Sequence, residues 1–291
     1  MKQQEQQATK KHSKWIFFEE FIGSFGIAFW TLLLCWLFNK YNVLTLFSIG
    51  GNVAVGWVLL SLVFGATYVP ILYLLLLLLN SFTSGEYFNP AITIGFWYKE
   101  SIKRPVAFKF MLSQFVGGIF AGLLIYVLIG LCDNSRPDWW TNPDAGYMGA
   151  TGIKDWWVKN SPDVLYWHIM ETLYIPTILS WAIAVLIEAT IFFLFMLLVL
   201  NVNKMSKHKH TRWVYLSIGL ALMVALGIPF TGASMNPIRS IGPVLFGSWG
   251  ENSSYWWLQY SIAVVGPILG TLVASYIQLK TIDKKVVNIT Y

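Results

Sequence analysis

The chain has 291 residues, of which 56% are apolar and 12% charged, and its formal net charge is +6 at pH 7. Because soluble domains carry about 25% charged residues, this composition excludes a soluble enzyme, a nucleic-acid-binding domain and a disordered tail. A mean hydropathy of +0.57 and long apolar stretches predict an integral membrane protein. The two cysteines, Cys35 and Cys132, provide neither a disulfide framework nor the spacing of a metal site.

Residues 1–14 are polar and lack the apolar core of a cleavable signal, so they are predicted to form a short solvated tail. Six apolar segments follow, each of about 18–26 residues, which is enough to cross ~30 Å of hydrocarbon. They are 15–38, 56–79, 106–131, 178–202, 213–230 and 255–279. The region 43–79 is too long for one span, and its start, 43–53, is assigned to an apolar outer loop or a helix extension.

Lysine and arginine indicate how these spans are oriented. Four segments, 2–14, 99–109, 204–212 and 280–285, together hold 15 of the 20 basic residues. With six spans, all four fall on one face of the membrane, and basic residues mark the cytoplasmic side. Both termini are therefore expected in the cytoplasm, and the positive charge indicates orientation, with no nucleic-acid partner expected.

Two short stretches repeat each other: SGEYFNPAITIG at 84–95 and TGASMNPIRSIG at 231–242. Each follows the second span of a three-span half, and an odd number of spans turns the second copy upside down. Inverted repeats of this kind place a substrate path at their mutual interface, near the middle of the bilayer.

The Asn-Pro pair in each repeat is a helix start, because Asn caps the helix and Pro at its first position loses no hydrogen bond. Too few apolar residues follow to cross the membrane, so each is predicted to be a re-entrant half-helix. Asn89 and Asn236 would then meet from opposite faces. Two positive helix ends and two carboxamides at one point repel cations and protons but orient water or an alcohol.

Together with Glu20, Glu188, Gln114 and Arg239, the two Asn-Pro boxes resemble the aquaporin family of major intrinsic proteins. The resemblance spans about residues 15 to 280. It implies an all-α fold of six transmembrane helices plus two half-helices, homotetramers, and one pore per protomer for water and small neutral solutes in a lipid bilayer. No His, Cys or acidic grouping forms a nucleophile with a base or a metal cluster, so no enzyme, no catalytic residue, no cofactor and no metal are expected.

The resemblance also implies roles for individual residues. The pore boxes would be Asn89, Pro90 and Ala91 in the first half and Asn236, Pro237 and Ile238 in the second. Glu20 and Glu188 would hold the re-entrant loops, and Arg239 would be the selectivity-filter arginine. Alternatives are snorkelling of Glu20 to the membrane interface, and an interface-anchor role for Arg239.

Counting back from each Asn gives the rest of the filter, a ring of Val69, Val224, Ala233 and Arg239. Such a ring is expected to be wider and less polar than a strict water filter, which favours passage of glycerol or urea besides water. Ser240, where glycerol facilitators carry Asp, points the other way.

Three further departures are noted. Ile238 stands where the family usually has Ala, and is expected to alter the contact between the half-helices. Tyr87 replaces the usual His, and Glu86 adds a carboxylate at the cytoplasmic mouth.

The predicted organisation is a tail at 1–14, a first repeat at 15–131 with a half-helix near 89–98, an extracellular Trp- and Asp-rich loop at 132–177, a second repeat at 178–279 with a half-helix near 236–246, and a tail at 280–291. The long loop is expected to be a lid on the outer face, and a gate or a partner-binding site is the alternative. The predicted function is a passive channel, located in the plasma membrane. A secondary active transporter of a small solute would use the same inverted repeat, and it stays open at this point.

Overall fold

The structure is a computed structural model that describes residues 2–41, 43–49, 52–79, 87–132, 177–247 and 253–281, all within or between helices. The first group of helices is α1 (Lys2–Lys40), α2 (Val43–Phe47), α3 (Val53–Leu78), α4 (Pro90–Tyr98) and α5 (Arg104–Cys132). The second is α8 (Thr177–Met205), α9 (Lys209–Thr231), α10 (Pro237–Gly247) and α11 (Ser253–Thr281). The predicted loop at 132–177 lies almost wholly outside the described residues.

Six of these helices are long and apolar enough to cross a membrane. Their spans are Phe17–Phe38, Val55–Leu78, Arg104–Leu128, Trp181–Met205, Lys209–Thr231 and Tyr260–Lys280. Each lies within a few residues of a span predicted from apolar length. The all-α fold with six transmembrane helices is therefore confirmed.

Two boundaries differ from, or refine, what the sequence suggests. The segment predicted as a tail is helical from Lys2 and runs without a break into the first span. The reason is that it contains neither Gly nor Pro and is rich in good helix formers. The apolar stretch before the second span forms the short helix α2, after which Asn52 caps α3 by accepting a hydrogen bond from the Val55 N–H at 3.2 Å.

The long helices pack as two related sets. Helix α1 lies along α5 in the first half, α8 lies along α11 in the second, and α3 packs on α9 between them. Close approach depends on glycine: a Cβ at Gly117 would lie 2.5 Å from the Phe21 carbonyl oxygen, and one at Gly270 would lie 2.3 Å from the Ala189 carbonyl oxygen. Small residues at such contacts let membrane helices pack backbone to backbone.

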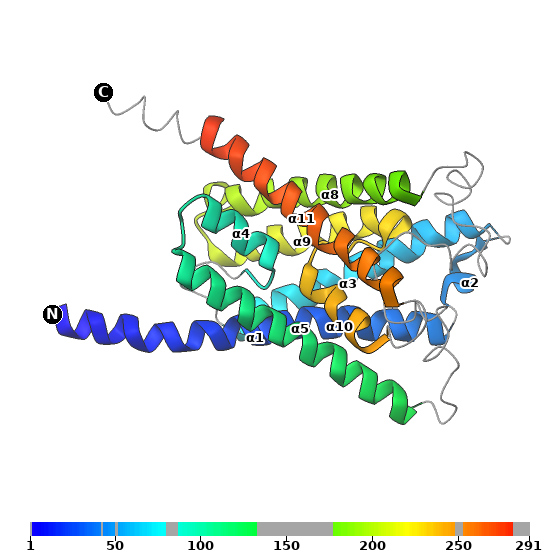
Figure 1. The fold of residues 1–291 in the computed structure, drawn as a ribbon, viewed down its shortest axis with the longest axis horizontal. Helices are drawn as coiled ribbons and strands as arrows, with labels where there is room; N and C mark the ends of the chain where they lie inside the picture. Colours follow the sequence, from blue (N-terminus) through cyan, green and yellow to red (C-terminus); the bar gives the residue numbers. More distant parts are fainter. Residues whose placement is uncertain are drawn as a thin grey trace.

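Helices α4 and α10 are the half-helices, with nine and eleven residues. Each begins at the proline that follows its asparagine, at Pro90 and Pro237. Figure 1 shows α4 at the end of the bundle where α1 starts and α11 ends, and α10 nearer the end that holds α2. The two halves of the bundle interior are called here the α4 side and the α10 side of the central asparagines.

Candidate functional site

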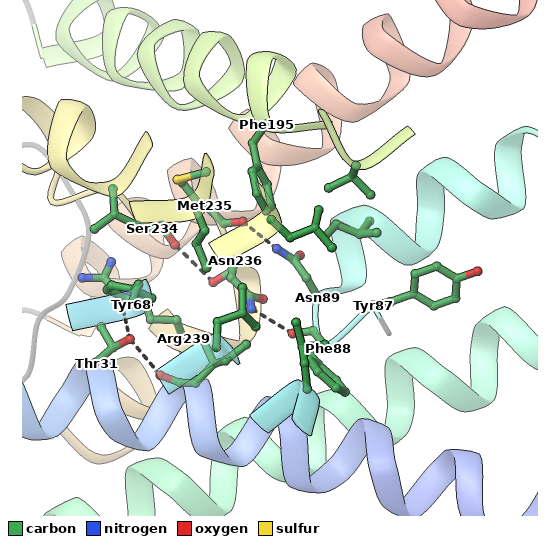
Figure 2. A pocket seen from close by; sticks show the side chains of 18 residues that line it. Thr31, Tyr68, Tyr87, Phe88, Asn89, Phe195, Ser234, Met235, Asn236 and Arg239 are labelled. Atoms are coloured by element: carbon green, nitrogen blue, oxygen red, sulfur yellow. Dashed lines mark hydrogen bonds between the residues drawn. The ribbon is translucent and has the colours of Figure 1, made fainter. Parts of the chain in front are cut away.

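The two asparagines join the half-helices at the centre of the bundle. The Asn89 side chain donates from Nδ2 to the Met235 carbonyl oxygen at 2.7 Å, and the Asn236 side chain donates from Nδ2 to the Phe88 carbonyl oxygen at 3.0 Å (Figure 2). Each Oδ1 accepts from its own helix start, at Ala91 and at Ile238. A carboxamide has two N–H donors, so each asparagine keeps one more for a molecule between the half-helices.

The residues just before the asparagines have an unusual backbone. Phe88 has a φ of 43° and Met235 a φ of 49°, both in the left-handed region although neither is glycine. A non-glycine residue in this conformation costs about 1–3 kcal/mol. The strain turns each carbonyl towards the opposite asparagine. Phe and Met give no hint of it in the sequence, and only the shared pattern of the two repeats could have suggested it.

Glu20 on α1 holds the first of these segments. Its carboxylate accepts hydrogen bonds from the Tyr87 N–H at 3.0 Å, from the Phe88 N–H at 2.9 Å and from Gln114 Nε2 at 2.6 Å. Gln114 also donates to Thr93 on α4 at 2.9 Å. Glu20 is 2% exposed, so the alternative in which it snorkels to the interface is wrong.

Glu188 on α8 holds the second segment in the same way. It accepts from the Ser234 N–H at 2.9 Å, from the Met235 N–H at 2.9 Å and from the Thr231 hydroxyl. Glu188 is fully buried. A buried carboxylate in a membrane needs such partners because water is not there to solvate it. Both glutamates therefore hold in place the backbone segments before the asparagines, which have no regular secondary structure.

A cavity of about 70 Å³ passes the two asparagines, which is room for several water molecules. Its wall differs on the two sides. On the α10 side the lining includes Thr31, Tyr68, Val224, Ser234 and Arg239, and on the α4 side it includes Leu72, Leu76, Ile92, Phe195, Leu216 and Leu220. The polar side chains at the cavity therefore lie mainly on the α10 side, whereas the α4 side is mainly apolar, with Tyr87 as an exception.

The predicted filter ring is only partly on this wall. Val224 and Arg239 line the cavity, whereas Val69 and Ala233 do not. The Ala233 Cβ instead faces Gly227 on α9, and Ser234 takes its place at the cavity. Arg239 is 4% exposed and lines the cavity, which does not agree with the interface-anchor alternative.

On the α10 side, α3 lines the cavity with Tyr68, and Val69, the residue predicted there, is not part of the lining. A shift of one residue turns a side chain by about 100° around a helix, and Val69 packs into the apolar core instead. Figure 2 shows Tyr68 together with Thr31 and Arg239 at one side of the asparagine pair. At this level the cavity wall thus carries an aromatic hydroxyl where a small apolar residue was predicted.

The structure also places Ile238 and Tyr87, two residues that differ from the usual family pattern. Ile238 is fully buried but does not line the cavity. It packs on α5, where a Cβ at Gly118 would lie only 2.9 Å from the Ile238 Cβ, so a glycine on α5 makes room for this residue. Tyr87 lines the cavity, and its ring lies 4.8 Å from that of Phe96; in Figure 2 it points away from the asparagines. Glu86 lies outside the described residues.

Residues 7–278 match the model of the family described as Major intrinsic protein. The chain belongs to the major intrinsic protein family. This family consists of membrane channels and not of enzymes, so the chain is an integral, multi-pass membrane protein of the channel class. The transporter alternative does not agree with this membership.

Curated relatives carry names of both kinds. The chain is 25% identical to Aquaporin Z of Photorhabdus laumondii over 222 residues, which cover 75% of this chain and 82% of that protein. It is 26% identical to Glycerol uptake facilitator protein-like 6 of Lactiplantibacillus plantarum, over 66% of this chain and 73% of the relative. It is 28% identical to Aquaporin-5 of Botryotinia fuckeliana over 82% of this chain, but it spans only about a third, 35%, of that longer protein.

A solved structure has the same fold. The X-ray structure of the aquaglyceroporin from Plasmodium falciparum superposes with a TM-score of 0.60, over 94% of this chain and 98% of the other. The identity is 16%, so this likeness concerns the fold of this major intrinsic protein and not its solute.

Proposed function

We propose that this protein is a passive channel for water and for small uncharged solutes such as glycerol and urea, and that it excludes ions and protons. The observation that carries the proposal is the pair of half-helix starts that meet on one cavity, joined by reciprocal hydrogen bonds of Asn89 and Asn236. Each helix N-terminus bears about half a positive charge. Two of them at one point repel a cation from either side.

Proton exclusion follows from the same geometry. A water molecule between the two carboxamides accepts a hydrogen bond from the free N–H of Asn89 or Asn236, because each of these groups is a donor. Its own hydrogens then point away from the centre in both directions. A proton relay needs a water chain with one continuous orientation, and this centre interrupts it.

The wall suits a solute that has both polar groups and carbon–hydrogen bonds. Arg239 supplies hydrogen-bond donors on the α10 side, and the carbonyl oxygens of Phe88 and Met235 supply acceptors at the centre. The leucines of the α4 side contact the carbon skeleton. The names of the relatives from Photorhabdus laumondii and Lactiplantibacillus plantarum, which refer to an aquaporin and to glycerol uptake, support both kinds of solute.

Purified protein in liposomes tests the proposal by stopped-flow light scattering. We expect water and glycerol flux above that of empty liposomes, with a low activation energy and no dependence on a sodium or proton gradient. Flux that requires either gradient would contradict a channel and would indicate a coupled transporter. Flux no faster than that of empty liposomes would contradict both.

Orientation, assembly and location belong to the same proposal. We expect both termini in the cytoplasm of a cell whose plasma membrane holds the protein, because most described basic residues at or beyond the ends of the spans lie at the end of the bundle that holds α4, while Lys40 lies at the opposite end. Those at the α4 end include Lys99, Lys103, Lys204, Lys207 and Lys280. We also expect a homotetramer with one pore in each protomer. Protease access from each side of oriented vesicles checks the first expectation, and native mass spectrometry in detergent checks the second.

A further inference from the structure

We propose that Thr31 is a positioning residue for Tyr68. By accepting a hydrogen bond from the Tyr68 hydroxyl, Thr31 leaves the phenol oxygen as a hydrogen-bond acceptor on the side of the cavity where Arg239 supplies donors. The channel would then favour neutral solutes that carry a donor and an acceptor close together, namely polyols and amides. This inference rests on the proposed channel function and names a determinant of its solute class.

The direction of the hydrogen bond follows from counting protons. The Thr31 hydroxyl donates to the Ile27 carbonyl oxygen at 2.8 Å, one turn back along α1. It is also hydrogen-bonded to the Tyr68 hydroxyl on α3. A hydroxyl has one proton to give. Because the Thr31 hydroxyl donates its one hydrogen to the Ile27 carbonyl oxygen, Tyr68 is the donor in the Thr31–Tyr68 hydrogen bond. Towards any other group, the Tyr68 oxygen can then only accept.

The pair is buried at the cavity. Thr31 is fully buried, Tyr68 and Arg239 are each 4% exposed, and all three line the cavity. Tyr68 and Arg239 both line the cavity on the same side of the asparagines (Figure 2). Arginine has donors and no acceptor, so this side of the wall offers an acceptor at Tyr68 and donors at Arg239. A solute hydroxyl can donate to Tyr68 while its neighbour accepts from Arg239.

Thr31 is well suited to fix this arrangement. It is β-branched, so its χ1 angle is restricted within a helix, and its bond to Ile27 restricts it further. The Tyr68 ring is also packed against Phe64, with the ring centres 6.0 Å apart. Without the Thr31 hydroxyl, the Tyr68 hydroxyl would donate to other partners, including the solute or cavity water. Tyr68 would then act as a donor as well as an acceptor towards the solute.

The same two helices provide a matched control. Trp30 donates from Nε1 to the Thr67 hydroxyl at 3.1 Å, one residue before Thr31 on α1 and one before Tyr68 on α3. Thr67 donates in turn to the Phe64 carbonyl oxygen at 2.7 Å. Neither Trp30 nor Thr67 lines the cavity. Thr67→Val therefore removes a comparable bond between α1 and α3 without touching the wall.

The experiment measures the ratio of glycerol to water permeability, and of urea to water permeability, in proteoliposomes. Tyr68→Phe and Thr31→Val should each lower both ratios by about threefold to tenfold, the worth of one net hydrogen bond. Thr31→Ser, which keeps the hydroxyl, should restore most of the ratio. Thr67→Val should leave it unchanged. The double variant Thr31→Val/Tyr68→Phe should equal Tyr68→Phe alone, because Thr31 acts through that hydroxyl.

Three flux results would each overturn the proposal: an unchanged ratio in Thr31→Val, an equal drop in Thr67→Val, or additive losses in the double variant. Water permeability of the unaltered protein tests the channel function separately, because no substitution is involved. If that permeability is absent, the channel proposal fails, and the solute selection proposed here fails with it.

Infrared spectroscopy of protein with isotope-labelled tyrosine tests the positioning itself without any flux. Thr31→Val should shift one tyrosine C–O stretching band, and the shift should be missing when Tyr68 is already Phe. No shift would overturn the positioning role, whether or not the protein conducts.

Discussion

The two halves of this protein share the same hydrogen-bonded frame, a buried glutamate and an asparagine that hold the start of each half-helix, but they line the cavity with different side chains. In each half a buried glutamate accepts two backbone N–H bonds from the residues before an asparagine, and that asparagine reaches across to the other half. The wall differs three residues after each asparagine, where the first half has Ile92 and the second has Arg239, both at the cavity. The repeat thus places the cavity between the two halves, and different residues at corresponding positions make one side of the cavity more polar than the other.

The third bond to each glutamate differs as well. Gln114 reaches Glu20 from α5 and is tied to α4 through Thr93, whereas Thr231 reaches Glu188 from the end of α9, next to the segment it helps to hold. The first frame therefore connects three helices, and the second is more local. Variants in corresponding positions of the two halves can show where the likeness holds.

The largest effect should come from the glutamates. Glu188→Ala removes the acceptor of three hydrogen bonds, each worth about 1.5–3 kcal/mol with a charged partner, and we expect the folded channel to be lost or its unfolding temperature in detergent to fall by roughly 10 °C or more. Glu20→Ala should match it. Glu100→Ala, at an exposed residue after α4, is the control. If Glu20→Ala were tolerated while Glu188→Ala was damaging, the two glutamates would not have equivalent roles in the two halves.

The next prediction separates stability from selectivity at Ile238, the residue after the second proline. Ile238→Ala should lower the free energy of unfolding by about 2–5 kcal/mol, because it empties a packed site against α5. The glycerol-to-water permeability ratio should not change, since Ile238 does not line the cavity. Thermal unfolding and stopped-flow flux on the same preparation check both parts, and a changed ratio would place Ile238 at the pore after all.

Arg239→Val tests the polar side of the wall. Removing the buried guanidinium should admit cations, seen as an ionic current across planar bilayers that the unaltered protein lacks. Ile92→Val at the corresponding position of the first half is the matched control and should add no current. Unchanged exclusion in Arg239→Val would sink the assignment of this arginine as a filter.

The smallest effect concerns the width of the cavity at Val224. Val224→His should lower glycerol permeability by about tenfold, or about 1.4 kcal/mol, and should spare water, because the larger ring narrows the cavity. Val69→Ala should change neither permeability, since Val69 faces the core. If Val69→Ala raised glycerol flux while Val224→His did nothing, the lining described for α3 and α9 would be wrong.

Much of the fold is visible in the sequence because its signals are local. Apolar length marks the six spans, and Asn-Pro followed by a short apolar run marks each half-helix. Side-chain direction is less accessible. The count from Asn89 back to α3 passes through residues 80–86, which have no periodic pattern, so an error of one residue replaced Tyr68 by Val69.

Two further features need contacts that no spacing reveals. Ile238 turns towards Gly118, which is distant in sequence. Thr31 matters through a hydrogen bond between α1 and α3. A threonine in a membrane helix has no pattern that marks it as a partner of a tyrosine 37 residues later.

The most direct test of the central claim measures water and proton permeability in the same proteoliposomes, with a pH-sensitive dye inside and an osmotic step outside. The geometry of the two asparagines predicts water flux well above that of empty liposomes and a proton leak no greater than theirs. A proton leak that rises with the water flux would contradict the interrupted water chain at Asn89 and Asn236, and with it the function proposed for this cavity.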